Sequence, residues 1–356
     1  MKICAGPGIL RAAGWAHQLG AGVLLSRVKN RFQRQAFNYV GTVMPGTATP
    51  ADPSLTDENT NRDEHSTEWY ARDAVALTER WTAWLGTRLT RLHRQSVRTD
   101  GSRAIDYTQS FNSPFAALSY AYAPDQLVYA SWGRGIESSV APNRNRYTNA
   151  GEASTQTSRQ AEVGVKGSTE ALEWSAALFD IRRKVSADIG ACDDPGTCTY
   201  QPDGTQNHLG AEASLAWRSG PWTWRAGTQW LHARREGSAN PLVNGKRPYN
   251  VPERTFKLQA EHRLAALPGT VFEATGSFES HRYVDPANTA SIPGYAVFDL
   301  ALRHEMQLGG QRVLWRGGID NLADKRAWRE SPYQFLHTYL YPLRPRTAWL
   351  GVQFDL

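Results

Sequence analysis

Residues 347–356 read TAWLGVQFDL, and apolar and polar side chains alternate along the whole stretch. The even-numbered positions carry Ala, Leu, Val, Phe and Leu, whereas most of the odd-numbered positions are polar or small. Successive side chains of a β-strand point to opposite faces, so this period of two predicts a strand with one apolar face.

The same alternation recurs throughout the chain, at 160–166, 208–218, 222–230 and 254–264. The mean hydropathy is −0.53 and only 40% of the residues are apolar, yet there are 13 Trp, 14 Tyr and 11 Phe. No stretch approaches the roughly 20 consecutive apolar residues of a membrane-spanning helix. A helical membrane protein is therefore excluded, whereas a membrane β-barrel, whose strands average out as polar, is allowed.

The connections between these segments alternate in length. Short turns are expected at 77–80, 123–126, 167–170, 218–221, 266–269 and 307–311. Long polar connections are expected at 33–64, 95–111, 134–157, 184–206, 235–252, 282–292 and 322–344. Short periplasmic turns and long extracellular loops are typical of a transmembrane antiparallel β-barrel, here with about fourteen strands. A soluble sandwich or propeller would explain the strands but not the loop asymmetry.

The charge and the cysteine content indicate which partners and which cellular compartment are compatible with the sequence. The formal net charge is +6, but the basic residues are scattered singly, which argues against a nucleic-acid partner. Cys192 and Cys198 enclose a short CDDPGTC segment that predicts a disulfide-bonded loop in an oxidising compartment. Neither cysteine has the neighbours of a zinc site, so no metal site is expected.

Specific segments add a family resemblance. Near the carboxy terminus stand IPGYAVFD at 292–299, GIDNLADK at 318–325 and PRTAWLGV at 345–352. Further upstream stand RFQRQAFNY at 31–39, LVYASWGRG at 127–135 and EVGVKG at 162–167. Taken together, and in the order in which they follow one another along the chain, these segments resemble segments of TonB-dependent outer-membrane siderophore receptors.

The resemblance implies a receptor in the cell outer membrane for TonB-dependent uptake of ferric siderophores. Such receptors are barrels of about 22 strands filled by a plug. We therefore expect residues 16–356 to be the carboxy-terminal part of that barrel, truncated so that the plug and the TonB box are absent. Residues 1–15 are expected to be an irregular amino terminus without a clear signal peptide, because Gly6, Pro7 and Gly8 interrupt its apolar residues. The alternative is a self-contained passive channel of about fourteen strands.

Some motif residues are expected to be architectural. Asn321 and Asp324 are predicted to organise a turn, since Asn and Asp side chains bond nearby backbone amides. Pro293 and Gly294 are predicted to start a strand, where a missing backbone donor costs little.

No arrangement of residues predicts an enzyme, and no catalytic residue or cofactor is expected. The partners implied are a ferric siderophore, the outer membrane with its lipopolysaccharide, and the TonB complex, the last only through the missing plug. Arginine and aromatic side chains on loops suit an anionic chelate by charge and stacking. The candidate ligand-binding residues are Arg134, Arg144, Arg146, Tyr147, Trp328 and Tyr333. The alternative is that loop arginines bind lipopolysaccharide phosphates or no ligand.

Overall fold

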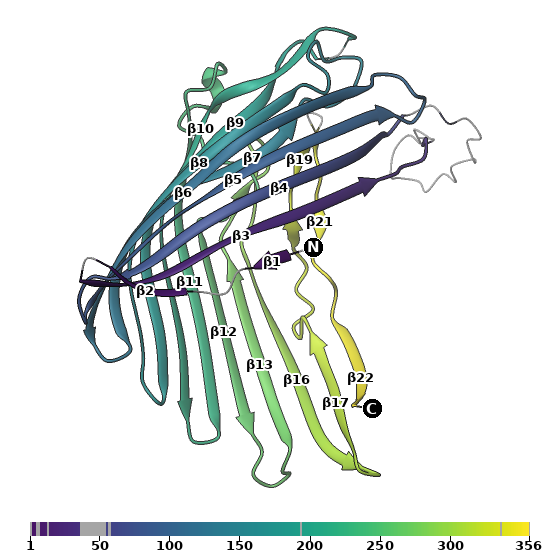
Figure 1. Ribbon diagram of the computed structural model, residues 1–356. Coiled ribbons are helices and arrows are strands. Elements are labelled where there is room, and N and C mark those ends of the chain that lie inside the picture. The colour runs from purple at the N-terminus through teal and green to yellow at the C-terminus, as the bar shows by residue number, and fades with distance from the viewer. Residues whose placement is uncertain are drawn as a thin grey trace, which may run out of the picture. The chain divides into compact units, whose positions relative to one another are not determined.

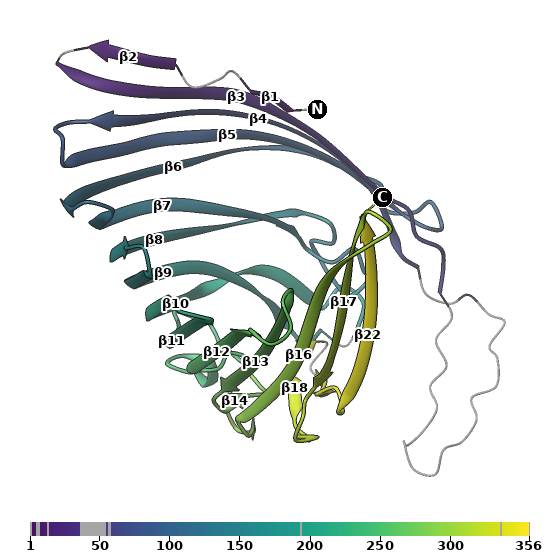
Figure 2. The ribbon, with the colours of Figure 1, turned by 90° about the horizontal axis from the view of Figure 1, so that it is seen from below.

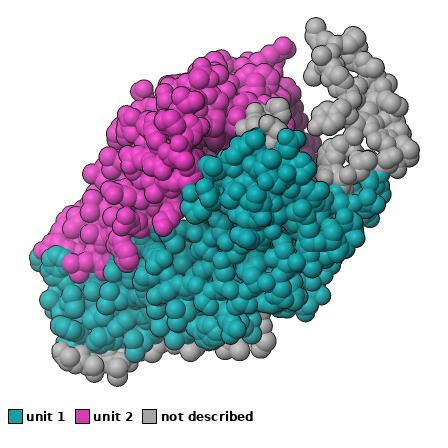
Figure 3. Space-filling model, turned by 90° about the horizontal axis from the view of Figure 1, so that it is seen from above, with its two compact units in different colours: residues 1–116, 133–158, 185–202 teal, residues 117–132, 159–184, 203–356 magenta. Residues whose placement is uncertain are grey.

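The computed structural model describes residues 2–4, 8–12, 14–35, 55, 58–192, 194–334 and 337–355. Residues 36–39 of the upstream family-like segment, and Leu356 of the final strand, lie outside this set. Two compact units divide the described chain (Figure 3). Unit 1 comprises residues 1–116, 133–158 and 185–202, and unit 2 comprises 117–132, 159–184 and 203–356.

The strands pair in one large sheet whose order follows the sequence (Figures 1 and 2). Fourteen of its strands in the described residues have nine or more residues, which confirms the expected number. Two shorter strands, β1 (Lys2–Cys4) and β2 (Gly8–Ala12), both pair with the first long strand. The long strands are β3 (Trp15–Asn30), β4 (Thr60–Ala76), β5 (Trp81–Arg98), β6 (Ile105–Ala123), β7 (Gln126–Val140), β8 (Ala153–Ser168), β9 (Leu172–Gly190), β10 (Cys198–Ser219), β11 (Trp222–Glu236), β12 (Arg254–Arg263), β13 (Thr270–Glu279), β16 (Tyr295–Leu308), β17 (Gln311–Asp320) and β22 (Thr347–Asp355).

Strand register keeps the apolar side chains on one face. Directly opposite residues of an antiparallel pair lie on the same face. Trp315 lies opposite both His304 of β16 and Val352 of β22. The side chain of Leu350, on the same side of β22 as Val352, is 75% exposed. A continuous exposed apolar face of this kind is expected when lipid rather than protein covers it.

The other face of the sheet carries charged side chains that pair with one another. The Glu261 carboxylate accepts hydrogen bonds from Arg225 and, at 3.3 Å, from Arg303. On the neighbouring pair of strands, Arg312 bonds Glu305 at 2.6 and 2.7 Å. The strand carboxylates on this face are thus at least partly neutralised by arginines, as expected of a hydrated interior surface.

The short turns fall where the sequence predicts them, and the tightest occupy only 124–125, 220–221 and 309–310. Three of the expected long loops are wrong in extent. Residues 99–104, 141–152 and 191–197 are all that lie between the strands where loops were expected at 95–111, 134–157 and 184–206. The reason is that polar strand ends continue to pair beyond the apolar band, so polarity there marks water-exposed strand rather than loop.

Two of the other long connections, 280–294 and 321–346, contain small pairs of strands. These are β14 (Arg282–Tyr283) with β15 (Ser291–Ile292), β18 (Trp328–Glu330) with β21 (Tyr341–Pro342), and β19 (Tyr333–Gln334) with β20 (His337–Thr338). The only helical element among the described residues is a 3₁₀ turn, η1 (Pro241–Val243). None of the described residues forms a helix long and apolar enough to span a bilayer.

Candidate ligand-binding loops

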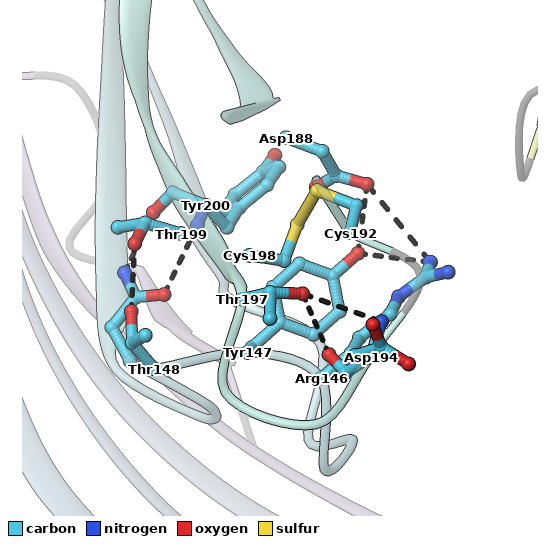
Figure 4. Close-up of a disulfide and its surroundings, with 11 residues drawn as sticks. Arg146, Tyr147, Thr148, Asp188, Cys192, Asp194, Thr197, Cys198, Thr199 and Tyr200 are labelled. Carbon is cyan, nitrogen blue, oxygen red and sulfur yellow. Dashed lines mark hydrogen bonds and ion pairs between the residues drawn. A yellow bond between two sulfur atoms is a disulfide. The ribbon is translucent and has the colours of Figure 1, made fainter. Parts of the chain in front are cut away.

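In unit 1, a disulfide joins Cys192 to Cys198 across the loop between β9 and β10 (Figure 4). Cys198 is fully buried and Tyr147, from the loop between β7 and β8, is only 4% exposed. Together with Cys192, the two residues form a small apolar cluster against which Ala150 and Tyr200 pack. The disulfide is therefore the centre of a local core in which two loops meet.

Tyr147 also occupies a polar network. Its hydroxyl donates to the Asp188 carboxylate at 2.9 Å and accepts from the Arg146 guanidinium at 3.2 Å. The Arg146 guanidinium carbon lies 5.1 Å from the centre of the Tyr147 ring. Burial raises the pKa of Tyr147; the bond from Arg146 opposes this rise, and the bond to Asp188 adds to it. The ring is thus a neutral donor held between an acid and a base (Figure 4).

Backbone hydrogen bonds also join the loop 141–152 to the residues at the disulfide. The Thr148 amide donates to the Cys198 carbonyl at 2.8 Å, and the Cys198 amide donates to the Arg146 carbonyl at 2.9 Å. The side chain of Asn149 bonds both the amide and the carbonyl of Tyr200, at 3.1 and 2.7 Å. The loop 141–152 is therefore hydrogen-bonded to the first residues of β10, next to the disulfide.

The sequence-predicted residues of unit 1 have different surroundings. Arg146 and Tyr147 come together at the disulfide, and the side chain of Tyr147 is mostly covered. Arg144 is exposed near the tip of the loop, where its carbonyl accepts from Arg103 at 3.1 Å. Arg134 lies within β7 rather than in a loop, because that strand continues to Val140.

A second set of loops, in unit 2, contains the other two candidates. Trp328 in β18 is 42% exposed. The ring of Tyr333 in β19 lies 5.6 Å from that of Tyr249, a residue that the sequence pattern did not single out. No local motif marks Tyr249, because its partner comes from a loop far along the chain.

Asn250 connects these loops. Its side-chain oxygen accepts from the Ser331 amide at 2.9 Å and from the Ser331 hydroxyl at 3.3 Å. Its backbone φ of 58° is the left-handed conformation that Asn tolerates better than most residues. Ser331 is fully buried. This contact joins the loop 237–253 to the loop 321–346.

A third loop, 280–294, forms hydrogen bonds with both the loop 237–253 and the loop 321–346. The Asn288 side chain bonds the backbone amide and carbonyl of Arg247 at 2.8 and 2.9 Å. The Thr338 hydroxyl donates to the Val284 carbonyl at 3.0 Å. Hydrogen bonds thus join these three loops to one another. Their aromatic residues Tyr249 and Tyr333 contact each other across two of the loops and not through the sheet.

The base of the first of these loops is held by a buried carboxylate. Asp203 of β10 is 6% exposed and accepts from the Ser238 hydroxyl at 2.6 Å, the Ala239 amide at 2.7 Å and the Arg235 guanidinium. An unpaired carboxylate in this position would be costly, and these three donors compensate its burial. The sequence pattern did not predict this role.

Asn321 and Asp324 organise a turn, as the sequence predicted, whereas Pro293 and Gly294 lie just before β16 rather than at its start. Asn321 accepts from the Lys325 amide at 2.7 Å and donates to the carbonyls of Lys325 and Arg344 at 3.0 and 2.9 Å. Asp324 accepts from the Arg346 amide at 3.0 Å. Both residues have positive φ, 51° and 49°. They close the turn after β17 and align the chain for β22.

Among the described residues, Asp188, Cys192 and Cys198 are the one group whose potential metal-ligand atoms lie within 4.8 Å of one another. Both sulfurs are joined in the disulfide, and a metal requires a thiolate. This group therefore carries no metal-binding assignment.

A sheet of long antiparallel strands, apolar on one face and charged on the other, with short turns and long loops in alternation, is typical of a transmembrane β-barrel. The chain belongs to the family described as TonB dependent receptor-like, beta-barrel, whose model matches residues 8–322. The predicted fold class, a transmembrane antiparallel β-barrel, is confirmed.

The ferrichrome receptor FcuA of Yersinia enterocolitica is 26% identical over 199 residues, covering 56% of this chain and 25% of that protein. A probable TonB-dependent siderophore receptor, PiuA of Acinetobacter baumannii, is 25% identical over 317 residues, 81% of this chain and 40% of that protein. The crystal structure of BauA, the ferric preacinetobactin receptor of Acinetobacter baumannii, superposes with a TM-score of 0.77 at 21% identity, over 98% of this chain and 53% of that one. This chain thus spans less than half the length of these two curated relatives.

Proposed function

We propose that this chain captures ferric siderophores at the cell outer membrane, as the barrel region of a receptor for their TonB-dependent uptake. The family match carries the proposal, and the names of the relatives, a ferrichrome receptor and a probable siderophore receptor, support its ligand class. We propose no catalytic step for it, since the family and the fold are those of transport receptors.

The loop chemistry suits such a cargo. A ferric siderophore already fills the coordination shell of its iron, so the protein needs no metal ligand or resident cofactor. It needs side chains that recognise the outside of the complex. Exposed Arg144 supplies positive charge in unit 1, and exposed Trp328 supplies a flat apolar surface in unit 2. Both are on loops, where a receptor can vary specificity on a rigid scaffold.

Two candidate residues are less exposed, since Tyr147 is buried and Tyr333 is half-buried. Tyr147 and Tyr333 hold the loops in place through Asp188 and Tyr249, and so preorganise the surface that the cargo meets. In the proposed receptor, the TonB complex acts through a plug segment, whereas the strands and loops described here bind the cargo. The surrounding lipopolysaccharide contacts the outer face of the sheet.

Binding of iron-55-labelled ferric hydroxamates, ferrichrome and ferrioxamine, to the purified full chain in detergent tests this proposal. We expect saturable binding that Arg144→Ala or Trp328→Ala weakens by about tenfold, equivalent to the roughly 1.4 kcal/mol of one good contact. The matched control is Arg218→Ala, because Arg218 lies at the short-turn end of β10 and pairs with Glu173 at 2.9 Å. Steady conductance in planar bilayers without saturable siderophore binding would instead establish the passive channel.

A further inference from the structure

The loop between β11 and β12 contains the one Asn-Gly pair of the sequence, Asn244 and Gly245. An asparagine side chain that precedes glycine can be attacked by the glycine amide nitrogen, because glycine has no Cβ to hinder the approach. Both residues are exposed, so water reaches them. A Cβ at Gly245 would meet no atom within 4 Å, so the surroundings do not crowd the backbone here. The pair is therefore a candidate for covalent modification.

The hydrogen bonds of the loop engage the groups that would react. The Gly245 amide donates to the Arg235 carbonyl at 2.7 Å. The Asn244 side-chain oxygen accepts from the Ser238 amide at 2.9 Å, and its side-chain nitrogen donates to the Ser238 carbonyl at 2.9 Å. The reaction needs the Gly245 nitrogen without its proton and the Asn244 side chain turned towards that nitrogen. The closed loop therefore holds both reacting groups in other bonds.

Asp203 of β10 holds the two residues to which the pair is bonded. Its carboxylate accepts from the Ser238 hydroxyl at 2.6 Å and from the Arg235 guanidinium, which also donates to the Asp203 carbonyl at 2.9 Å. Asp203 is 6% exposed, so these bonds form where water does not compete for them. Loss of this carboxylate should therefore release Ser238, Arg235 and the Asn-Gly pair bonded to them.

We propose that Asn244 is a deamidation site, and that opening of the loop 237–253 sets the rate of its modification. In the open loop, the deprotonated Gly245 nitrogen forms a bond with the side-chain carbonyl carbon of Asn244. The bond from that carbon to Nδ2 breaks, and Nδ2 leaves as ammonia with the proton that Gly245 gave up. Water then hydrolyses the cyclic imide at either carbonyl, which yields aspartate or isoaspartate. The reaction consumes only water, so it needs no oxidant, reductant or catalytic group.

The product cannot restore the closed loop. A carboxylate at position 244 has no N–H to donate, so two acceptors would face each other at the Ser238 carbonyl. Isoaspartate also lengthens the backbone, which displaces the Gly245 amide from the Arg235 carbonyl. The loss of ammonia makes the change one-way. A loop that has opened and reacted therefore stays loosened.

The modification also affects a neighbouring loop. The loop 237–253 carries Tyr249 and Asn250, which contact two residues of the loop 321–346, Tyr333 and Ser331. Loosening of the first loop weakens these contacts. The inference concerns the chain itself and does not depend on the proposed cargo.

Peptide mapping by mass spectrometry of the purified full chain, incubated in detergent at mildly alkaline pH, measures the deamidated fraction at Asn244 over time. We expect the folded chain to react about tenfold more slowly than the chain unfolded in urea, because the rate follows the population of the open loop. Asp203→Ala should raise the rate in the folded chain by about tenfold, and Ser238→Ala, which removes one bond to Asp203, by less. The matched control is Asp188→Ala, since Asp188 is a carboxylate that accepts a loop hydrogen bond in unit 1.

Two further variants test the chemistry and its consequence. Gly245→Ala should slow deamidation severalfold in the urea-unfolded chain, because a Cβ next to the attacking nitrogen hinders it. Asn244→Asp reproduces one product in the folded chain. Its Gly245 amide should exchange hydrogen faster than in the unaltered chain, since the loop that holds this amide is loosened.

Equal rates in the folded and the unfolded chain, or an equal increase in Asp188→Ala and Asp203→Ala, would overturn the control by the loop. Absence of deamidation at Asn244 in the unfolded chain, or an unchanged rate there in Gly245→Ala, would overturn the site itself. Heat-dependent mobility on gels shows whether Asp203→Ala is folded. If it is not, an unchanged rate in Ser238→Ala refutes the role of Asp203.

Discussion

The Tyr147 hydroxyl donates a 2.9 Å hydrogen bond to the carboxylate of Asp188, a residue 41 positions further along the chain. The bond fixes the loop after β7 against the end of β9, next to the disulfide of Cys192 and Cys198. A residue that the sequence singles out as a possible ligand contact is thereby a buried structural element.

Removal of this hydroxyl tests that role. We expect Tyr147→Phe to loosen the joined loops by about 1 kcal/mol, because the hydrogen bond from the buried Tyr147 side chain to Asp188 is lost, while the exposed Asp188 carboxylate can bond water instead. Faster amide hydrogen exchange at Thr148 and Cys198 measures the loosening, since both amides bridge the two loops. Tyr200→Phe is the control, and equal exchange in the two variants would contradict the assignment.

Asn321 should be the most sensitive position of the turn after β17. Asn321→Ala removes three side-chain hydrogen bonds at a residue that is 3% exposed and has a φ of 51°. We expect a loss of about 2 to 4 kcal/mol, measured by urea unfolding in detergent. Leu322→Ala, at a neighbouring residue that is 37% exposed, should cost much less. Asn321→Gly relieves the backbone strain but not the lost bonds, so stability like that of the unaltered chain in Asn321→Gly would argue against the side-chain role.

Gly294 is required by a close approach of two backbones. A Cβ at this position would lie 2.6 Å from the Glu279 carbonyl oxygen and 2.9 Å from the Ser280 carbonyl carbon. We therefore expect Gly294→Ala to reduce the folded fraction, scored by heat-dependent mobility on gels. Gly227→Ala is the matched control, because a Cβ at Gly227 would meet no atom within 4 Å. Equal folding of the two variants would refute this account of the IPGY segment.

Asp285 gives the loop 280–294 a dependence on acid. Burial acts to raise the pKa of its carboxyl, but hydrogen bonds from Ala290 and Thr289 outweigh it, so the pKa lies below the ordinary value of 3.8. A depressed folded pKa means that the stabilisation is present above the ordinary value and is lost as pH falls through the folded one. We expect Asp285→Ala to lower the melting temperature at pH 7 but to have little effect once the carboxyl is protonated. A decrease of the same size at pH 7 and at a pH below the folded pKa of Asp285 would exclude titration of Asp285 as the cause.

The amino-acid sequence alone determined the strands and their faces. Alternation at 347–356 predicted β22 and the side on which Leu350 lies, because a period of two is a local property of an extended chain. Short turns were equally local, since Gly309 and Gly310 both adopt positive φ there. The family-like motifs around Asn321 and Gly294 also identified their turns.

Only the tertiary structure decided which loops touch and which charged residues share a row. Asn250 and Ser331 are 81 positions apart, and the Tyr249–Tyr333 contact depends on the same meeting of loops. Pattern reasoning placed the ends of β5 and β9 too early, because polar residues beyond the apolar band look like loop although they still pair. Arg27, His65 and His93 lie side by side on neighbouring strands only because of strand register. Register is a relation between distant segments, and local periodicity does not contain it.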